Sequence, residues 1–267
     1  MIASTLDAVK YALKTCETVL YELSVTGCEF PTEGEEPPAK RSKATNDNIL
    51  PEDELEDLRK RMVLRDELRE NLIKKCRDGQ KAAKQAIYAL HREDFKKAEK
   101  LIADCEKCIL EELTPIVDKE PQLRYGSFAN VLEEYAEAKL FYEWLGNDVE
   151  TPAGVVLAPT DFTVIPLEPE EYLGGIADLT GEIGRFAVKR GTIRDTKNVK
   201  LSLETVMCIL YAFESLCKLP GGGIGKKIDP LRRCAEKLEK MLYELSLSEA
   251  SGRKIVAGVN EIQSDNL

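Results

Sequence analysis

The chain has 267 residues, 43% of them hydrophobic, which is enough for one large domain or two small ones with a substantial core. Its formal net charge of −10 argues against nucleic-acid binding over the whole surface, but leaves room for a local basic stripe or a basic partner subunit. No run of about 18 apolar residues occurs and charges interrupt the N-terminus, so we expect an intracellular protein without a membrane span.

Apolar residues recur at spacings of three and four along most of the chain, which predicts helices. The expected helices cover residues 3–25, 52–92, 93–117, 122–146, 169–190, 200–218 and 229–248. Strand signals are weak, and the best of them, at residues 154–165, also fits an irregular crossover. With no strands to build a sheet, the sequence predicts an all-α antiparallel helix bundle of about seven helices.

Segments with proline and glycine divide the chain into four regions. These are an N-terminal helix within 1–28, a linker at 29–51, a helical domain at 52–250 and a tail at 251–267. The linker is polar and proline-bearing, so we expect it to be disordered, and its residues 37–43 resemble a short nuclear-import signal. Pro51, at the end of the linker, and the pair Asp229 and Pro230, within the domain, mark helix starts. Residues 221–227 lack the strand and the Ser or Thr of a phosphate loop, which predicts a flexible connector.

Two segments carry pairs of acids at helical spacing. If residues 132–138 and 172–182 are helical, Glu134 and Glu137 stand at i,i+3, and Asp178 and Glu182 at i,i+4. Paired acids are usually a solvated face, but both pairs have apolar neighbours, and no Lys or Arg follows Glu134 or Asp178 at i+4. Four convergent carboxylates would make a magnesium site. Spacing places each pair on one face of its helix and does not show that the pairs meet.

The cysteines and the histidine give weaker indications of a functional site than the acids do. The eight cysteines are scattered and indicate reduced core thiols; Cys105 and Cys108 are expected on a buried helix face rather than in a redox or zinc site. His91 is the single histidine, so one chain cannot build a two-histidine metal site, and a capping or packing role is favoured. Gly174 and Gly175 in a helical segment indicate a close helix approach.

Three stretches resemble the translin family, and within it the Trax branch. They are Ala86-Ile87-Tyr88-Ala89-Leu90-His91-Arg92 with Arg77-Asp78 upstream, residues 132–141, and the segment 171–182, whose Ala-Asp-Leu-Thr-Gly-Glu core is the most specific. The resemblance covers about residues 60–248. It implies an all-helical subunit that assembles with translin into a barrel-like hetero-oligomer holding single-stranded RNA or DNA, in the cytoplasm and the nucleus.

The resemblance also implies a magnesium-dependent endoribonuclease site formed by the acids at the positions that spacing selects: Glu134, Glu137, Asp178 and Glu182. Mg²⁺ prefers carboxylate oxygens and water and stabilises charge in phosphodiester cleavage, with Mn²⁺ as an alternative. Basic residues on or beside the acidic segments are the candidates for phosphate contacts: Arg92, Arg124, Lys139 and Arg185. The aromatic residues that follow, Tyr135 and Phe141 among them, favour core packing over base stacking.

The N-terminal segment departs from the pattern of the family. Residues 20–24 and 242–246 share the sequence Leu-Tyr-Glu-Leu-Ser, and residues 12–31 resemble the C-terminal helix of a Trax-like protein. The first copy is an added helix, a permuted element that competes with the second copy, or a gene-model artefact, and the sequence does not choose among them.

Three hypotheses for function follow. The first is an endoribonuclease subunit for single-stranded or nicked short RNA. The second is a non-catalytic scaffold that stabilises translin and helps it hold single-stranded RNA or DNA. The third, a purely structural helical interaction protein, leaves the two acidic segments unexplained.

Overall fold

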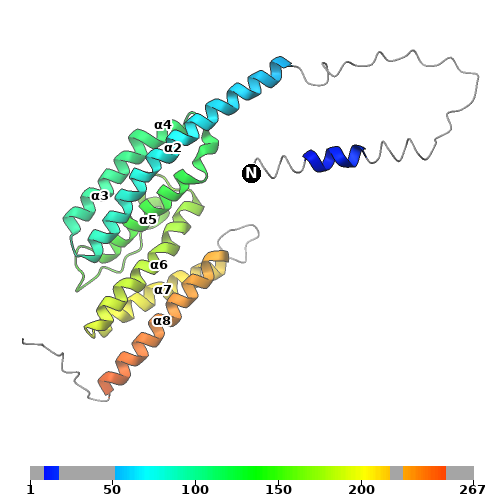
Figure 1. Ribbon diagram of the computed structural model, residues 1–267. Coiled ribbons are helices and arrows are strands. Elements are labelled where there is room, and N and C mark those ends of the chain that lie inside the picture. The colour runs from blue at the N-terminus through cyan, green and yellow to red at the C-terminus, as the bar shows by residue number, and fades with distance from the viewer. Residues whose placement is uncertain (1–8, 18–51, 217–224, 251–267) are drawn as a thin grey trace, which may run out of the picture. The chain divides into compact units, whose positions relative to one another are not determined.

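The computed structural model describes residues 9–17, 52–216 and 225–250, and every regular element in these ranges is helical. The α-helices after residue 51 are α2 (Glu52–His91), α3 (Phe95–Lys107), α4 (Thr114–Val117), α5 (Ser127–Leu145), α6 (Pro169–Thr192), α7 (Thr196–Leu216) and α8 (Gly225–Ala250) (Figure 1). Short turns of other helix types are the π-helical η2 (Cys108–Leu113) and the 3₁₀ turns η3 (Pro121–Arg124) and η4 (Pro159–Asp161). The predicted all-α class is confirmed.

The chain divides into two compact units, Met1–Leu58 and Arg59–Leu267. In the first unit, residues 9–17 form an exposed helix, which agrees with the middle of the helix predicted over 3–25. The predicted linker at 29–51, residues 221–224 of the predicted connector and the tail at 251–267 lie outside the described residues. Within the described ranges, no helix is both long and apolar enough to cross a membrane.

The helix predicted over 93–117 is interrupted by the π-helical turn η2. Asp94 caps α3 by accepting a hydrogen bond from the main-chain N of Lys97 at 3.2 Å. Pro115 stands in the first turn of α4, where its ring has no N–H and would collide with the carbonyl four residues earlier in an α-helix. The wider π turn before it relieves this clash, and the hydroxyl of Thr114 donates to the carbonyl of Ile109 at 2.8 Å.

The predicted start of the last helix at Asp229 and Pro230 is wrong, because α8 already begins at Gly225 and contains Pro230. Pro230 stands in the second turn of α8, where it lacks the N–H that would bond the Lys226 carbonyl four residues earlier, so contacts elsewhere on the added turn must offset this loss. The added turn is held by Lys227, whose ammonium group lies 3.0 Å from Glu133 Oε2. Residues 225–227 are therefore helical and not part of a flexible connector.

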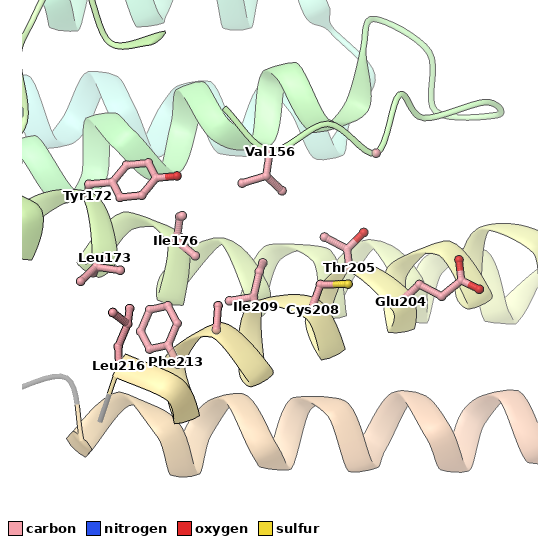
Figure 2. Close-up of a pocket in the computed structure, with 12 residues that line it drawn as sticks. Val156, Tyr172, Leu173, Ile176, Glu204, Thr205, Cys208, Ile209, Phe213 and Leu216 are labelled. Atoms are coloured by element: carbon pink, nitrogen blue, oxygen red, sulfur yellow. The ribbon is translucent and has the colours of Figure 1, made fainter. Parts of the chain in front are cut away.

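The segment between α5 and α6 is an irregular crossover, not a strand. It is fixed by hydrogen bonds from the Gly154 main-chain N to the Trp144 carbonyl at 2.9 Å and from the Tyr172 hydroxyl to the Leu157 carbonyl at 2.7 Å. The crossover, α6 and α7 enclose an apolar pocket of about 560 Å³, which Figure 2 shows.

The aromatic residues of α5 pack in the core, as predicted. Tyr135, Phe141 and Trp144 are fully buried, and Tyr142 packs against the core from its edge. The Trp144 indole donates to the hydroxyl of Thr205 on α7 at 3.2 Å, so its one polar atom is satisfied.

The predicted buried face for Cys105 and Cys108 is also confirmed. Both are buried, and their thiols donate to the main-chain carbonyls of Gly79 and Lys75 on α2. Burial raises the pKa of the Cys105 thiol to about 12, so this thiol stays protonated and unreactive at neutral pH.

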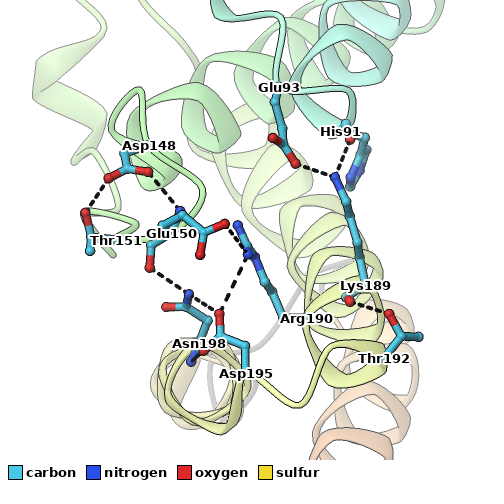
Figure 3. Close-up of polar contacts among 10 residues, drawn as sticks. All are labelled: His91, Glu93, Asp148, Glu150, Thr151, Lys189, Arg190, Thr192, Asp195 and Asn198. Carbon is cyan, nitrogen blue, oxygen red and sulfur yellow. Dashed lines mark hydrogen bonds and ion pairs between the residues drawn. The ribbon is translucent and has the colours of Figure 1, made fainter. Parts of the chain in front are cut away.

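A buried arginine ties the end of α6 to its neighbours. Arg190 is buried and donates to Glu150 in the crossover at 2.8 Å, with Asp195 at 3.8 Å (Figure 3). Asn198 at the start of α7 donates to the Glu150 carbonyl at 2.9 Å. This network joins the crossover, α6 and α7, which fixes the direction in which α6 leaves the core.

Helices α5 and α6 form the most extensive helix contact of the described chain, and glycine makes their approach close. A Cβ added at Gly175 would lie 2.6 Å from the Cβ of Ala136 and 3.1 Å from the Glu133 carbonyl oxygen. A Cβ added at Gly174 would overlap the Glu133 carboxylate. The close approach predicted from the two glycines is therefore present, and its partner is α5.

Gly175→Ala is expected to lower the free energy of unfolding by roughly 1–3 kcal/mol, because its Cβ would press against the backbone of α5. Gly181→Ala is the matched control: on the same helix, no described atom lies within 4 Å of the added Cβ, so its better helix propensity should stabilise by up to about 1 kcal/mol. Denaturant unfolding followed by circular dichroism measures both, and equal effects would contradict the close-approach assignment.

Candidate active site

The four predicted acids line one pocket of about 580 Å³ between α2, α5, α6 and α8. Glu134 and Glu137 come from α5, and Asp178 and Glu182 come from α6. Sequence spacing placed each pair on one helix face, and the structure brings the two faces together. The convergence follows from the close α5–α6 contact at Gly175, one helical turn before Asp178.

The acids differ in burial. Glu137 and Glu182 are each only 8% exposed, whereas Asp178 is exposed and Glu134 is half-buried at the pocket rim. Burial, followed by the nearby charges of Glu182, Asp178 and Glu134, raises the pKa of Glu137 to about 8. Glu137 is therefore largely protonated at neutral pH when no cation is present.

Three of the acids contact basic side chains. Lys84 of α2 lies 2.9 Å from Glu134, and Lys227 of α8 lies 3.4 Å from Asp178. Glu182 receives two partners, His91 Nε2 at 2.5 Å and Arg185 Nη1 at 3.0 Å. These ion pairs point the carboxylates toward different partners, and among the described residues no group of three His, Cys, Asp or Glu side chains forms a ready-made metal cluster.

His91 is held in place by contacts on both sides. Its ring packs against Phe141, with 4.9 Å between the centroids, so the predicted packing role is present. Lys189 of α6 donates to the His91 carbonyl at 3.3 Å and pairs with Glu93, which fixes the end of α2 beside α6 (Figure 3). The contact between the His91 ring and Glu182 was not predicted from the sequence.

Sequence reasoning also missed Lys84 and Lys227 as members of the site. Lys84 stands two helical turns before His91, so both residues lie on the same face of α2. Because His91 belongs to the Trax-like motif 86–92, this spacing could have predicted that Lys84 lies at the site. Lys227 gave no local signal, because its ion pairs with Glu133 and Asp178 depend on where α8 packs.

The four basic residues predicted for phosphate contacts fall into two groups. Arg185 lines the pocket, and Arg92 lies over the ring of pocket residue Tyr88. Arg124 and Lys139 do not line the pocket. Arg124 is occupied by buried Glu171 at 2.8 Å and Lys139 by Glu106 at 2.9 Å, so both serve internal ion pairs.

The donor set of the pocket is suited to a hard divalent cation. Its carboxylate oxygens are the ligands that Mg²⁺ and Mn²⁺ prefer. Ionising Glu137 beside three other acids is unfavourable, and a bound cation would offset this free-energy cost. Binding requires Glu134 and Asp178 to turn from Lys84 and Lys227, and partly exposed ion pairs of this kind contribute little stability.

Glu137→Gln is expected to stabilise the metal-free protein at pH 8 and to have little effect near pH 4.5. The folded protein holds the Glu137 proton with a raised pKa, so the stability from the protonated acid is complete below about pH 4.5 and is lost as the pH rises to about 8. The loss is on the order of 5 kcal/mol, and the glutamine removes it. Denaturant unfolding in EDTA at several pH values measures this, with the exposed Glu239→Gln as control; parallel pH profiles for wild type and Glu137→Gln would contradict it.

Comparisons with known proteins show which family this chain matches. Residues 67–249 match the translin family. The Translin-associated protein X homolog of Schizosaccharomyces pombe is 25% identical over 199 residues, which cover 69% of this chain and 84% of that protein.

Solved structures share the fold at low identity. They include apo-NeC3PO, with a TM-score of 0.61 and 19% identity over 74% of this chain and 98% of that chain. They also include AfC3PO, with a TM-score of 0.62, 20% identity and coverage of 74% and 99%, and an AfC3PO–duplex RNA complex, with a TM-score of 0.58, 21% identity and coverage of 74% and 98%. Because the family match spans more than half of the chain, this protein belongs to the translin family and resembles its Trax members.

Proposed function

We propose that this chain is the Trax-like subunit of a translin-type complex and a Mg²⁺-dependent endoribonuclease that cleaves single-stranded or nicked short RNA. The observation that carries the proposal is the convergence of four carboxylates from α5 and α6 on one pocket. An acidic pocket without a cation repels phosphate, so this arrangement fits phosphodiester chemistry only when a metal ion binds there.

Each carboxylate has a role in this proposal. Glu134, Glu137, Asp178 and Glu182 hold the ion, and one of them accepts the proton of the attacking water. Mg²⁺, with Mn²⁺ as an alternative, would supply charge that stabilises the transition state of phosphodiester cleavage. His91 and Arg185 hold Glu182 in orientation through its carboxylate, as outer partners of metal ligands commonly do.

The assembly partner in this proposal is translin, and the ligand is single-stranded RNA or DNA. Support comes from the likeness to the S. pombe Translin-associated protein X homolog and from the AfC3PO structure that holds duplex RNA. The import-like residues 37–43 support a nuclear as well as a cytoplasmic location.

A non-catalytic scaffold is the second candidate. The observation in its favour is that Lys84, Lys227 and Arg185 already pair with three of the four acids, so the pocket is internally neutralised in part. In this case the pocket would stabilise the fold, and the protein would help translin hold nucleic acid without cutting it.

Cleavage of labelled single-stranded RNA by this chain co-expressed with its organism's translin is expected in Mg²⁺ and not in EDTA. Asp178→Asn and Glu137→Gln should each reduce cleavage to the EDTA level, because each removes an anionic ligand while preserving side-chain volume. Glu239→Gln should cleave like wild type, and size-exclusion chromatography should show intact assembly for all variants. Mn²⁺ binding, measured by electron paramagnetic resonance, should weaken in the two pocket variants alone.

Undiminished cleavage in both pocket variants would refute the four-carboxylate site. RNA binding without cleavage by wild type in any metal would favour the scaffold.

A further inference from the structure

One face of α2 carries a stripe of exposed basic and aromatic side chains. We define the α2 stripe as Arg77, Lys81, Lys84 and Tyr88 of α2 together with Arg92, the first residue after the helix, all of which are exposed. Successive members are three or four residues apart, so they lie along one side of the helix. At 1.5 Å per residue the stripe is about 22 Å long.

The α2 stripe is a local reversal of the charge of the chain. Residues 74–92 contain six Lys or Arg residues and one acid, Asp78, although the chain as a whole carries −10. Arg77 and Lys81 have no ion-pair partner among the described residues, so their charges face solvent uncompensated by a neighbouring carboxylate. Positive potential concentrated on one helix face favours a polyanion there.

The α2 stripe leads into the carboxylate pocket. A shallow hollow of about 460 Å³ along α2 is lined by Arg77, Gln80, Lys81, Lys84, Gln85 and Tyr88. Two of these residues, Lys84 and Tyr88, also line the pocket that contains the four acids. A chain lying in the hollow would therefore reach the acids without a break.

Tyr88 provides an aromatic surface at the junction. Its side chain is 63% exposed, and the guanidinium carbon of Arg92 lies 5.6 Å from the ring centroid. The Arg92 Nη1 also lies 3.5 Å from the Tyr88 hydroxyl, which limits the orientations of both side chains. An exposed ring with a cation beside it is the combination that stacks a base and holds its phosphate.

We infer that the α2 stripe is the track on which a single nucleic-acid strand enters the carboxylate pocket. Arg77 and Lys81 contact phosphates along the helix, Tyr88 stacks a base, and Lys84 and Arg92 hold the backbone at the pocket mouth. This inference rests on the proposed nuclease function for its direction, since it delivers the strand to the acids.

A single strand fits these observations better than an acidic protein surface does. Its unpaired bases have faces that stack on Tyr88, whereas an acidic protein would engage the cations and leave the ring without a specific role. Duplex bases are already stacked on one another, so the exposed ring also favours a single strand or a frayed end over an intact duplex.

Binding of a fluorescein-labelled oligouridylate to the full-length chain, measured by fluorescence anisotropy in EDTA at several salt concentrations, tests the inference. Arg77→Ala and Lys81→Ala should each weaken binding and reduce the slope of log K against log salt by about 0.7, since each removes one phosphate contact. Tyr88→Ala should weaken binding roughly tenfold with an unchanged slope, because stacking releases no counterions.

Matched controls come from elsewhere on the chain. Tyr243→Ala on α8 removes a ring that is also 63% exposed, and Lys200→Ala on α7 removes an exposed lysine; neither should change the affinity or the slope. EDTA prevents metal-dependent cleavage of the RNA during the binding measurement. Stripe-dependent binding in EDTA together with no cleavage in Mg²⁺ would refute the nuclease proposal and leave the track intact.

Three results would overturn the inference. The first is no measurable binding by wild type, and the second is equal losses in stripe and control variants. The third is competition by polyglutamate that equals competition by unlabelled RNA, together with no effect of Tyr88→Ala, which would identify a surface for acidic proteins.

Discussion

The close contact between α5 and α6 is the constraint on which the site depends. Two helices normally keep 8–10 Å between their axes because side chains fill the space, and Gly175 against Ala136 removes those side chains at the crossing. The acids on both sides of the crossing are thereby brought into one pocket. The same crossing buries Glu137, so the geometry that assembles the site also creates its electrostatic cost.

This cost is not distributed evenly over the four acids. Glu134, Asp178 and Glu182 each have a cation within hydrogen-bonding or ion-pairing distance. Glu137 pairs with no cation among the described residues, and its pKa is raised by burial and by the other three carboxylates. Partial exposure limits the ion pairs of Lys84 and Lys227 to about 1 kcal/mol or less, whereas ionising a carboxyl with a pKa near 8 at higher pH costs several times more.

The helices and the two acid pairs could be predicted from the sequence, because both depend on the local spacing of side chains along the chain. It failed where distant parts of the chain decide the outcome. The π turn before Pro115 and the early start of α8 are adjustments to neighbouring structure. Lys227 acquires its role only when α8 packs against α5 and α6, and no spacing within residues 225–250 encodes that contact. The pairing of His91 with Glu182 likewise joins residues 91 positions apart.

Lys84 connects the two electrostatic features of the molecule. It is the only α2 cation that both belongs to the basic stripe and pairs with an acid of the pocket in the described chain. A phosphate at the pocket mouth would compete with Glu134 for this ammonium group, and Glu134 would then be released toward the interior of the pocket. In the proposed function, entry of a strand and rearrangement of the acids would be linked through one exposed, weakly bound side chain, which is the kind of contact that exchanges at low cost.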